Sequence, residues 1–172
     1  MTRTIGVAIA IPEPWATQLN AARHDAGDPA AANVPAHITL LPPTELTDDE
    51  RVIVEHHLTE AATRHRPFEL HLRGTGTFRP ITDVVFVAVA TGISECEMLE
   101  ADIRRGPLDR ELRFPYHPHV TVAHDVPTGA LDKAYEGLSD FDARFTVRGF
   151  TLFEHGCDGR WRPHREFPFG GA

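Results

Sequence analysis

Two short stretches of this 172-residue chain each pair a histidine with a threonine two positions later. They are His37-Ile38-Thr39-Leu40 and His119-Val120-Thr121-Val122. Side chains alternate between the two faces of a β-strand, so in each stretch the histidine and the threonine would share one face, about 6.6 Å apart along the strand. An imidazole and a hydroxyl at that spacing can both contact one small anion.

These residue types suit the cleavage of a phosphodiester, in which a base removes a proton from water or a 2′-hydroxyl and an acid protonates the leaving oxygen. Imidazole, whose reference pKa is about 6.5, can take either role near neutral pH, and such catalysis typically contributes about 10²–10⁴-fold. We therefore expect His37 and His119 to be catalytic, one as base and one as acid. Thr39 and Thr121 would bind the phosphate by donating to its oxygens. The scheme needs no metal and no other cofactor.

The setting of the two stretches supports a shared role. Each lies in an apolar, alternating run that a proline closely precedes, and the two lie in different halves of the chain. A third pair, His57-Leu58-Thr59, falls in a run with helical periodicity. Residues two apart on a helix do not face each other, so we exclude this pair. Two matching strands that meet would present both remaining histidines to one substrate.

Hydrophobic periodicity and breaker residues predict the elements that position the motifs. Pro42-Pro43 is expected to end the first motif strand, and residues 47–50 and 94–97 have the spacing of a capping box at a helix start. Strands are predicted at residues 4–11, 37–41, 68–73, 83–90, 119–123, 143–154 and 160–167, and helices at 15–24, 47–66, 94–105 and 129–138.

The predicted strand at residues 68–73 alternates with a period of two. We expect Leu70 and Leu72 to point inward and His71 to be an ordinary exposed strand residue. The stretch Gly74-Thr75-Gly76-Thr77 follows it. Its two glycines would either bring backbone N–H groups close to a ligand or form a bulge.

Together these elements predict an α+β fold with two antiparallel sheets that face a central cleft, with helices packed outside. Each half of the chain offers a strand, a helix, a motif strand, a helix and further strands, so we expect a bilobal, duplicated fold. The length suits one domain over residues 1–172. Its two pseudo-symmetric lobes would be the approximate halves that carry His37-x-Thr39 and His119-x-Thr121.

The motif residues resemble those of the 2H phosphoesterase superfamily, which includes the bacterial RNA 2′,3′-cyclic phosphodiesterases, also called 2′-5′ RNA ligases. The resemblance rests on HITLLPP at 37–43 and HPHVTVAH at 117–124, and GTGTFRP at 74–80 is similar to a loop between the motifs of these proteins. It implies the same bilobal fold and hydrolysis of RNA or nucleotide 2′,3′-cyclic phosphates to 2′-phosphates, with 2′-5′ RNA ligation as a related activity. By analogy, His119 would activate water and His37 would protonate the leaving oxygen.

Five further residues are candidate substrate contacts. Many relatives carry an arginine shortly after the second motif, where this chain has His124, and Arg113 upstream would supply the charge instead. Tyr116 and His117 would line the pocket, although His117 has an alternative as a plain loop histidine before a proline. Phe78 would stack on a base or pack in the core.

Composition excludes several classes of protein. A net charge of −8 and a pI of about 5.7 argue against a general polyanion binder. Lys133 is the only lysine, and local arginine clusters suit an RNA 3′ end or a small cyclic nucleotide as partner. No apolar run approaches the roughly 20 residues of a membrane span, so we expect no membrane partner and a cytoplasmic monomer. Cys96 and Cys157 are expected to be free thiols.

Two other functions are compatible with the sequence. Eleven histidines, with His117, His119 and His124 close together, would suit a zinc-dependent hydrolase, although the chain has no H-E-x-x-H and no Cys-x-x-Cys. A non-catalytic nucleotide- or RNA-binding module would keep the threonines and arginines as anion contacts without turnover. Metal analysis would identify the first, and binding without conversion would identify the second.

Overall fold

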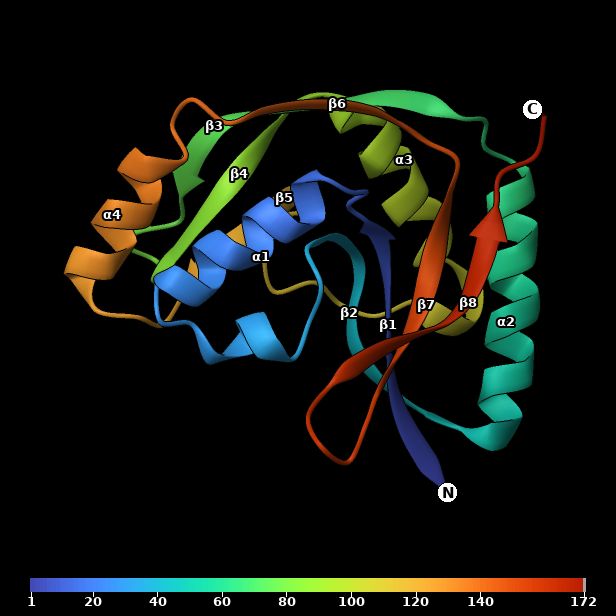
Figure 1. Ribbon diagram of the computed structural model, residues 1–172. Coiled ribbons are helices and arrows are strands. Elements are labelled where there is room, and N and C mark those ends of the chain that lie inside the picture. Colours follow the sequence, from blue (N-terminus) through green and yellow to red (C-terminus); the bar gives the residue numbers. More distant parts are fainter. Residues whose placement is uncertain (172) are drawn as a thin grey trace.

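The structure, a computed structural model, describes residues 1–171 of the chain (Figure 1). Over these residues it contains eight β-strands, four α-helices and two short 3₁₀ helices. The strands are β1 (Thr2–Ala10), β2 (His37–Thr47), β3 (Phe68–Thr77), β4 (Val84–Thr91), β5 (His119–His124), β6 (Asp142–Val147), β7 (Gly149–His155) and β8 (Trp161–Pro168). The helices are α1 (Trp15–Asp25), α2 (Asp48–Thr63), α3 (Ile93–Ile103) and α4 (Thr128–Gly137), with 3₁₀ helices η1 (Pro29–Ala32) and η2 (Gly106–Leu108).

The strands form two four-stranded sheets in which every neighbouring pair is antiparallel. The first sheet has the order β2-β1-β7-β8, and the second has the order β5-β4-β3-β6. This confirms the predicted α+β fold with two antiparallel sheets. The first sheet joins strands from both ends of the chain and the second uses only the middle, so the two sheets do not divide the chain at its midpoint.

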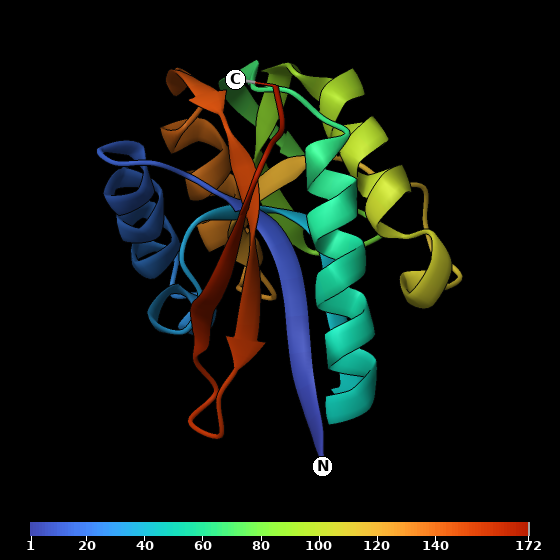
Figure 2. The same cartoon turned by 90° about the vertical axis from the view of Figure 1, so that its right-hand side faces the viewer.

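The helices lie at the periphery of the sheets. Helices α2 and α3 contact each other and strands of the first sheet, whereas α1 and α4 contact strands of the second. Figure 2 shows α2 and α3 side by side on one flank of the molecule and α1 on the opposite flank. None of the helices within residues 1–171 is both long and apolar enough to cross a bilayer.

Strand β2 continues through the two prolines that were predicted to end it, and it reaches Thr47. The reason is its place in the sheet. It is an edge strand that pairs only with β1, and its register against β1 shifts on either side of Val7. Proline lacks the N–H group that an inner strand needs, but an edge strand or a bulge accommodates it.

The two predicted capping boxes have different outcomes. At the start of α2, the Thr47 hydroxyl accepts from the Glu50 backbone N–H and the Glu50 carboxylate accepts from the Thr47 N–H, so this box is confirmed. At α3 the prediction is wrong, because the N-cap is Gly92, which has a φ of 102° and makes no side-chain cap. The helix therefore begins one residue before the serine that was expected to cap it.

His71 is buried, contrary to the expectation of an exposed position. Its strand, β3, lies between β4 and β6, and register shifts against β4 break the simple alternation of faces. Leu70, His71 and Leu72 are all buried in succession. The His71 Nε2 atom lies 3.1 Å from a carboxylate oxygen of Asp142, which satisfies the polar ring.

The predicted strand at 143–154 is two strands in different sheets. Strand β6 pairs with β3 in the second sheet, and after Arg148 the chain continues as β7, which pairs with β1 and β8 in the first. In Figure 1 β6 runs across the top of the molecule, and the chain then turns downward as β7. Gly149 marks the crossing, since a Cβ atom there would collide with the backbone of Phe167.

The two cysteines are free, as predicted. Cys96 is buried on α3, and Cys157 is exposed in the turn between β7 and β8. Burial, reinforced by the neighbouring Glu95 and Glu97 carboxylates, raises the pKa of the Cys96 thiol to about 12. Cys96 is therefore a neutral core residue at ordinary pH.

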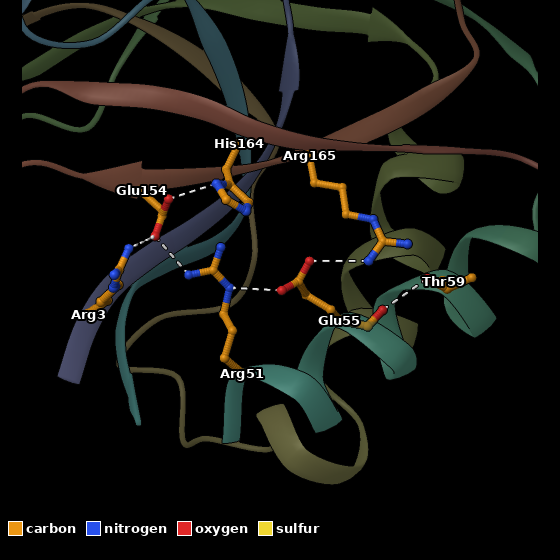
Figure 3. A network of polar contacts seen from close by, with 7 residues as sticks. All are labelled: Arg3, Arg51, Glu55, Thr59, Glu154, His164 and Arg165. Atoms are coloured by element: carbon orange, nitrogen blue, oxygen red, sulfur yellow. Dashed lines mark hydrogen bonds and ion pairs between the residues drawn. The ribbon is translucent and has the colours of Figure 1, made fainter. Parts of the chain in front are cut away.

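A network of ion pairs fastens α2 to the first sheet (Figure 3). Arg51 of α2 forms ion pairs with two carboxylates, with N–O distances of 2.8 Å to Glu154 on β7 and 3.1 Å to Glu55 on α2. Hydrogen bonding from Arg51 holds the pKa of Glu154 below its usual value. The other members of the network are Arg3 and His164, which bind Glu154, and Arg165, which binds Glu55.

Gly76 offers a direct test of packing in the second sheet. It lies opposite Phe86 in the β3–β4 register, and a Cβ atom at Gly76 would lie 2.5 Å from the Phe86 ring. We therefore expect Gly76→Ala to lower the free energy of unfolding by about 1–3 kcal/mol through overpacking. Urea denaturation measures this change.

Gly129 is the matched control, because it lies in α4 and a Cβ atom there meets nothing within 4 Å. Gly129→Ala should be neutral or stabilising by up to about 1 kcal/mol. Equal stability of Gly76→Ala and the unmodified protein would contradict the tight contact between Gly76 and Phe86.

Candidate active site

A cavity of about 430 Å³ is lined by residues of both sheets. Strands β1, β2, β7 and β8 of the first sheet and β4 and β5 of the second contribute to its wall, together with α1 and two connecting segments. The lining residues are Gly6, Val7, Ala8, Arg23, Val34, His37, Thr39, Leu41, Pro43, Phe78, Val84, His119, Thr121, His124, Phe153 and Trp161.

Both histidine–threonine motifs face this cavity. Strand β2 is the edge strand of the first sheet, β5 is the edge strand of the second, and the two strands contact each other. In each motif the histidine and the threonine line the cavity, while the intervening residues Ile38 and Val120 are fully buried. The alternation predicted from the sequence therefore directs two imidazoles and two hydroxyls into one space.

The two imidazoles are held in the same way. The Nδ1 atom of His37 lies 2.8 Å from the Pro35 carbonyl oxygen, and the Nδ1 atom of His119 lies 2.6 Å from the His117 carbonyl oxygen. A carbonyl oxygen only accepts, so each Nδ1 carries the hydrogen and donates it. In the neutral ring this leaves Nε2 with a free lone pair. The fixed tautomer makes each Nε2 ready to accept a proton.

Burial sets the charge of both rings. The pKa of His119 is lowered to about 4. Removal from water is the main cause, the bond to the His117 carbonyl opposes it, and the nearby His117 and His37 rings act in the same direction as burial. Burial is also the main cause of the lowered pKa of His37, and the charge of Arg23 acts in the same direction. Both imidazoles are therefore neutral at pH 7 in the free protein.

Aromatic side chains form part of the cavity wall. Phe78 meets the His119 ring edge-on, with 4.9 Å between ring centroids, and packs against Phe86 at 4.6 Å. Phe78 thus lines the cavity and packs against Phe86, while stacking on a base stays a prediction. Trp161 of β8 lies on the wall formed by the first sheet, where its ring lies close to Gly6. Sequence analysis did not single out Trp161, because nothing in a hairpin strand marks which aromatic faces a cavity.

The remaining predicted contacts are placed differently from one another. His124 lines the cavity, and its Nε2 lies 3.3 Å from a carboxylate oxygen of Asp125. His117 is exposed outside the cavity lining, with its ring centroid 5.8 Å from that of His119. Arg113 is exposed, lies over the Phe114 ring and is not one of the lining residues.

Tyr116 connects the two motif strands instead of lining the cavity. Its hydroxyl donates to the backbone carbonyl of Thr39 at 2.8 Å. Burial, with Cys96 and Glu100 nearby, raises the pKa of Tyr116, so the hydroxyl keeps its hydrogen at neutral pH. This bond joins the segment before β5 to the first motif near the start of β2, which fixes the two motifs relative to each other.

A positive charge lines the cavity at a position that the sequence did not indicate. Arg23, in the last turn of α1, is buried, and its Nε lies 2.7 Å from a carboxylate oxygen of Asp28. The two residues are five apart across a helix end, a spacing with no recognised signature. Among the residues that the structure describes, no group of three or more His, Cys, Asp or Glu side chains is arranged to hold a metal ion.

The partly buried position of His119 and its lowered pKa predict a pH dependence of stability. Its pKa is about 4 in the folded protein and about 6.5 in an unfolded chain, so the unfolded state binds more protons between these values. The free energy of unfolding should therefore fall as pH is lowered from about 6.5 to about 4, with roughly 3 kcal/mol of that fall due to His119. Urea denaturation at several pH values in this range measures the change. The free energy of unfolding should depend less steeply on pH for His119→Gln than for the unmodified protein.

The exposed His56 on α2 provides the control for this experiment. For His56→Gln, the free energy of unfolding should depend on pH as it does in the unmodified protein. If His119→Gln also keeps that dependence, the ring of His119 is not held neutral by burial.

Comparison with known proteins places this fold and site in a family. Residues 11–159 match the model of the 2′-5′ RNA ligase superfamily. Proteins of Bacillus mycoides strain KBAB4 and Bacillus cereus strain AH820 are each 28% identical over 145 residues, which is 83% of this chain and 84% of theirs. Both carry the word phosphoesterase in their names.

Solved structures share the fold along almost the whole chain. Apo LigT of E. coli superposes with a TM-score of 0.72 at 24% identity, covering 99% of both chains. A protein of Thermus thermophilus superposes with a TM-score of 0.66 at 22% identity, covering 96% of this chain and 97% of its own. Since the family match spans most of the sequence, the chain belongs to the 2′-5′ RNA ligase superfamily, among the 2H phosphoesterases that its two motifs resemble.

Proposed function

We propose that this protein is a metal-independent phosphoesterase that hydrolyses 2′,3′-cyclic phosphates of RNA ends or nucleotides to 2′-phosphates. The observation that carries the proposal is the matched pair of imidazoles, each with its Nδ1 bonded to the carbonyl two residues earlier and both lining one cavity. A base and an acid on the two sides of one phosphorus are what this hydrolysis needs.

In the proposed reaction, the Nε2 atom of His119 takes a proton from water as the water oxygen bonds to phosphorus. The bond between phosphorus and the 3′-oxygen breaks, and that oxygen receives a proton from Nε2 of His37. Thr39 and Thr121 donate hydrogen bonds to the non-bridging oxygens as negative charge builds on them. With the 5′-hydroxyl of a second RNA in place of water, the same steps form a 2′-5′ bond.

His37 must be protonated to act as the acid, although burial lowers its pKa in the free protein. A bound cyclic phosphate brings a negative charge into the cavity, and a nearby opposite charge favours the protonated ring. Substrate binding thus supplies the proton-bearing form of His37. The pKa of His119 is lowered to about 4, so its neutral ring can act as the base.

The substrate class is supported by the wall of the cavity and by relatives. Phe78 and Trp161 offer aromatic surface on which a nucleobase can stack, which is typically worth about 1–3 kcal/mol per base. Crystals of E. coli LigT hold 3′-AMP, ATP or NADP⁺. We infer an RNA 3′ end or a small cyclic nucleotide as substrate for this chain, acting as a single cytoplasmic domain with two lobes and as a monomer.

The test is hydrolysis of 2′,3′-cyclic mononucleotides, and of a short RNA ending in a 2′,3′-cyclic phosphate, with EDTA present. His37→Ala and His119→Ala should each lower kcat by at least about 10²-fold, because each removes one proton-transfer group. His56→Ala, which changes an exposed histidine of α2, should retain full activity. Product analysis should find the 2′-phosphate.

Other outcomes would replace the proposal. Activity that disappears on chelation would favour the zinc-dependent hydrolase. Tight binding of the cyclic nucleotide by folded protein without conversion would favour the non-catalytic binding module. Full activity of His37→Ala would refute the two-histidine mechanism.

A further inference from the structure

Arg23 is the cation of the cavity. Of the described residues that line it, Arg23 is the one arginine or lysine, and none is an aspartate or glutamate. The residue is only 7% exposed, so its charge is largely shielded from bulk water. A charge in such a place has a large effect on whatever enters the cavity, because solvent screens it poorly.

Asp28 holds Arg23 by one atom only. The Arg23 Nε donates to Oδ2 of Asp28 at 2.7 Å, and Oδ1 of Asp28 accepts from the Ala30 backbone N–H at 2.9 Å, where it caps η1. Asp28 is itself 4% exposed and belongs to the turn that follows α1. The carboxylate is therefore fixed from two sides and sets the direction of the guanidinium.

The two Nη groups of Arg23 take no part in the contact with Asp28. Among residues 1–171, no protein acceptor bonds them. Every fully buried side-chain nitrogen of the described residues has a partner, so these groups retain solvent contact, and Arg23 lines the cavity. A carboxylate paired with arginine for stability alone commonly engages two nitrogens of the guanidinium. Here two N–H₂ groups are free to donate into the cavity.

Arg23 and His37 both line the cavity. The charge of Arg23 contributes to the lowered pKa of His37, whereas it is not among the causes of the shift at His119. An anion that lies between Arg23 and His37 would meet a cation and an imidazole together. Arg113, the cation expected from the sequence, is exposed and outside the cavity lining.

We propose that Arg23 binds the phosphate of the substrate, with its two Nη groups donating to the non-bridging oxygens, and that Asp28 positions it through Nε. The inference rests on the proposed function and deepens it, because it assigns the charge recognition of the same site. The ligand class is an anionic phosphate, cyclic or monoester. The threonines of the two motifs share the phosphate with Arg23, and the neutral nucleoside part of the substrate does not depend on it.

The experiment measures binding of three probes by calorimetry to the purified protein: inorganic phosphate, 2′-AMP and the uncharged adenosine. Arg23→Gln should weaken phosphate and 2′-AMP by about 10- to 100-fold, the size expected for lost hydrogen bonds to a charged group. Adenosine should change by less than about twofold. Asp28→Asn should give a smaller loss for the two phosphates, since the guanidinium remains but loses its anchor.

Arg51→Gln is the matched control. Its side chain is 13% exposed against 9% for Arg23, and it also forms ion pairs, but on α2 in the network of Figure 3, outside the cavity lining. This variant should lose stability without any change in the affinity for phosphate. A loss of phosphate binding in both variants would assign the effect to damage of the fold and overturn the inference.

Further outcomes separate the inference from the function on which it rests. If Arg23→Gln is folded, binds phosphate normally and hydrolyses cyclic phosphate with unchanged kcat and KM, the inference fails and the proposed function stands. If phosphate binding needs Arg23 but the unmodified protein hydrolyses no cyclic phosphate, the inference stands and the proposed function fails. Should Arg23→Gln not fold, Arg23→Lys decides, because lysine keeps the charge without the paired donors. We expect it to bind phosphate about tenfold more weakly, and unchanged affinity would overturn the inference.

Discussion

The contact between two edge strands is the constraint on which the site depends. Strands β2 and β5 end their respective sheets, and they lie against each other with their polar faces turned to one cavity. The bond from Tyr116 to the Thr39 carbonyl holds this contact. Neither sheet has a complete site, since each supplies one imidazole and one hydroxyl. The geometry between the two histidines is therefore set by how the two sheets pack.

Burial serves both the fold and the chemistry of this cavity. Ile38 and Val120 are buried in the core, and removal from water also lowers the pKa of the neighbouring His37 and His119. Fixed carbonyl acceptors choose the tautomer, so the rings are prepared before a substrate arrives. In the proposed reaction a bound anion changes the protonation of the site, because its charge offsets the cost of an imidazolium that is shielded from water.

Periodic signals in the sequence were sufficient for the two-sheet α+β fold and for the motif faces, because alternation and capping are local properties. The capping box at Thr47 formed at the start of α2. At α3 the N-cap is Gly92 instead of Ser94, because the turn before the helix requires a left-handed backbone conformation. The burial of His71 and the continuation of β2 through Pro42-Pro43 depend on whether each strand is central or at an edge of its sheet. Strand pairing decides this, and the local sequence does not show it. Arg23 and Trp161 reach the cavity only through the packing of α1 and β8, so no spacing near the motifs could reveal them.

The first sheet draws its strands from opposite ends of the sequence, and this has a consequence for the order of synthesis. While the chain emerges from a ribosome, β1 and β2 are available early, but their neighbours β7 and β8 are made only after residue 148. The sheet that carries His37 therefore stays incomplete through most of translation. Pairings of such long sequence separation form slowly, and until then the exposed edge of β1 is open to wrong partners. The part of the cavity wall that Trp161 forms is therefore among the last parts of the site to be made.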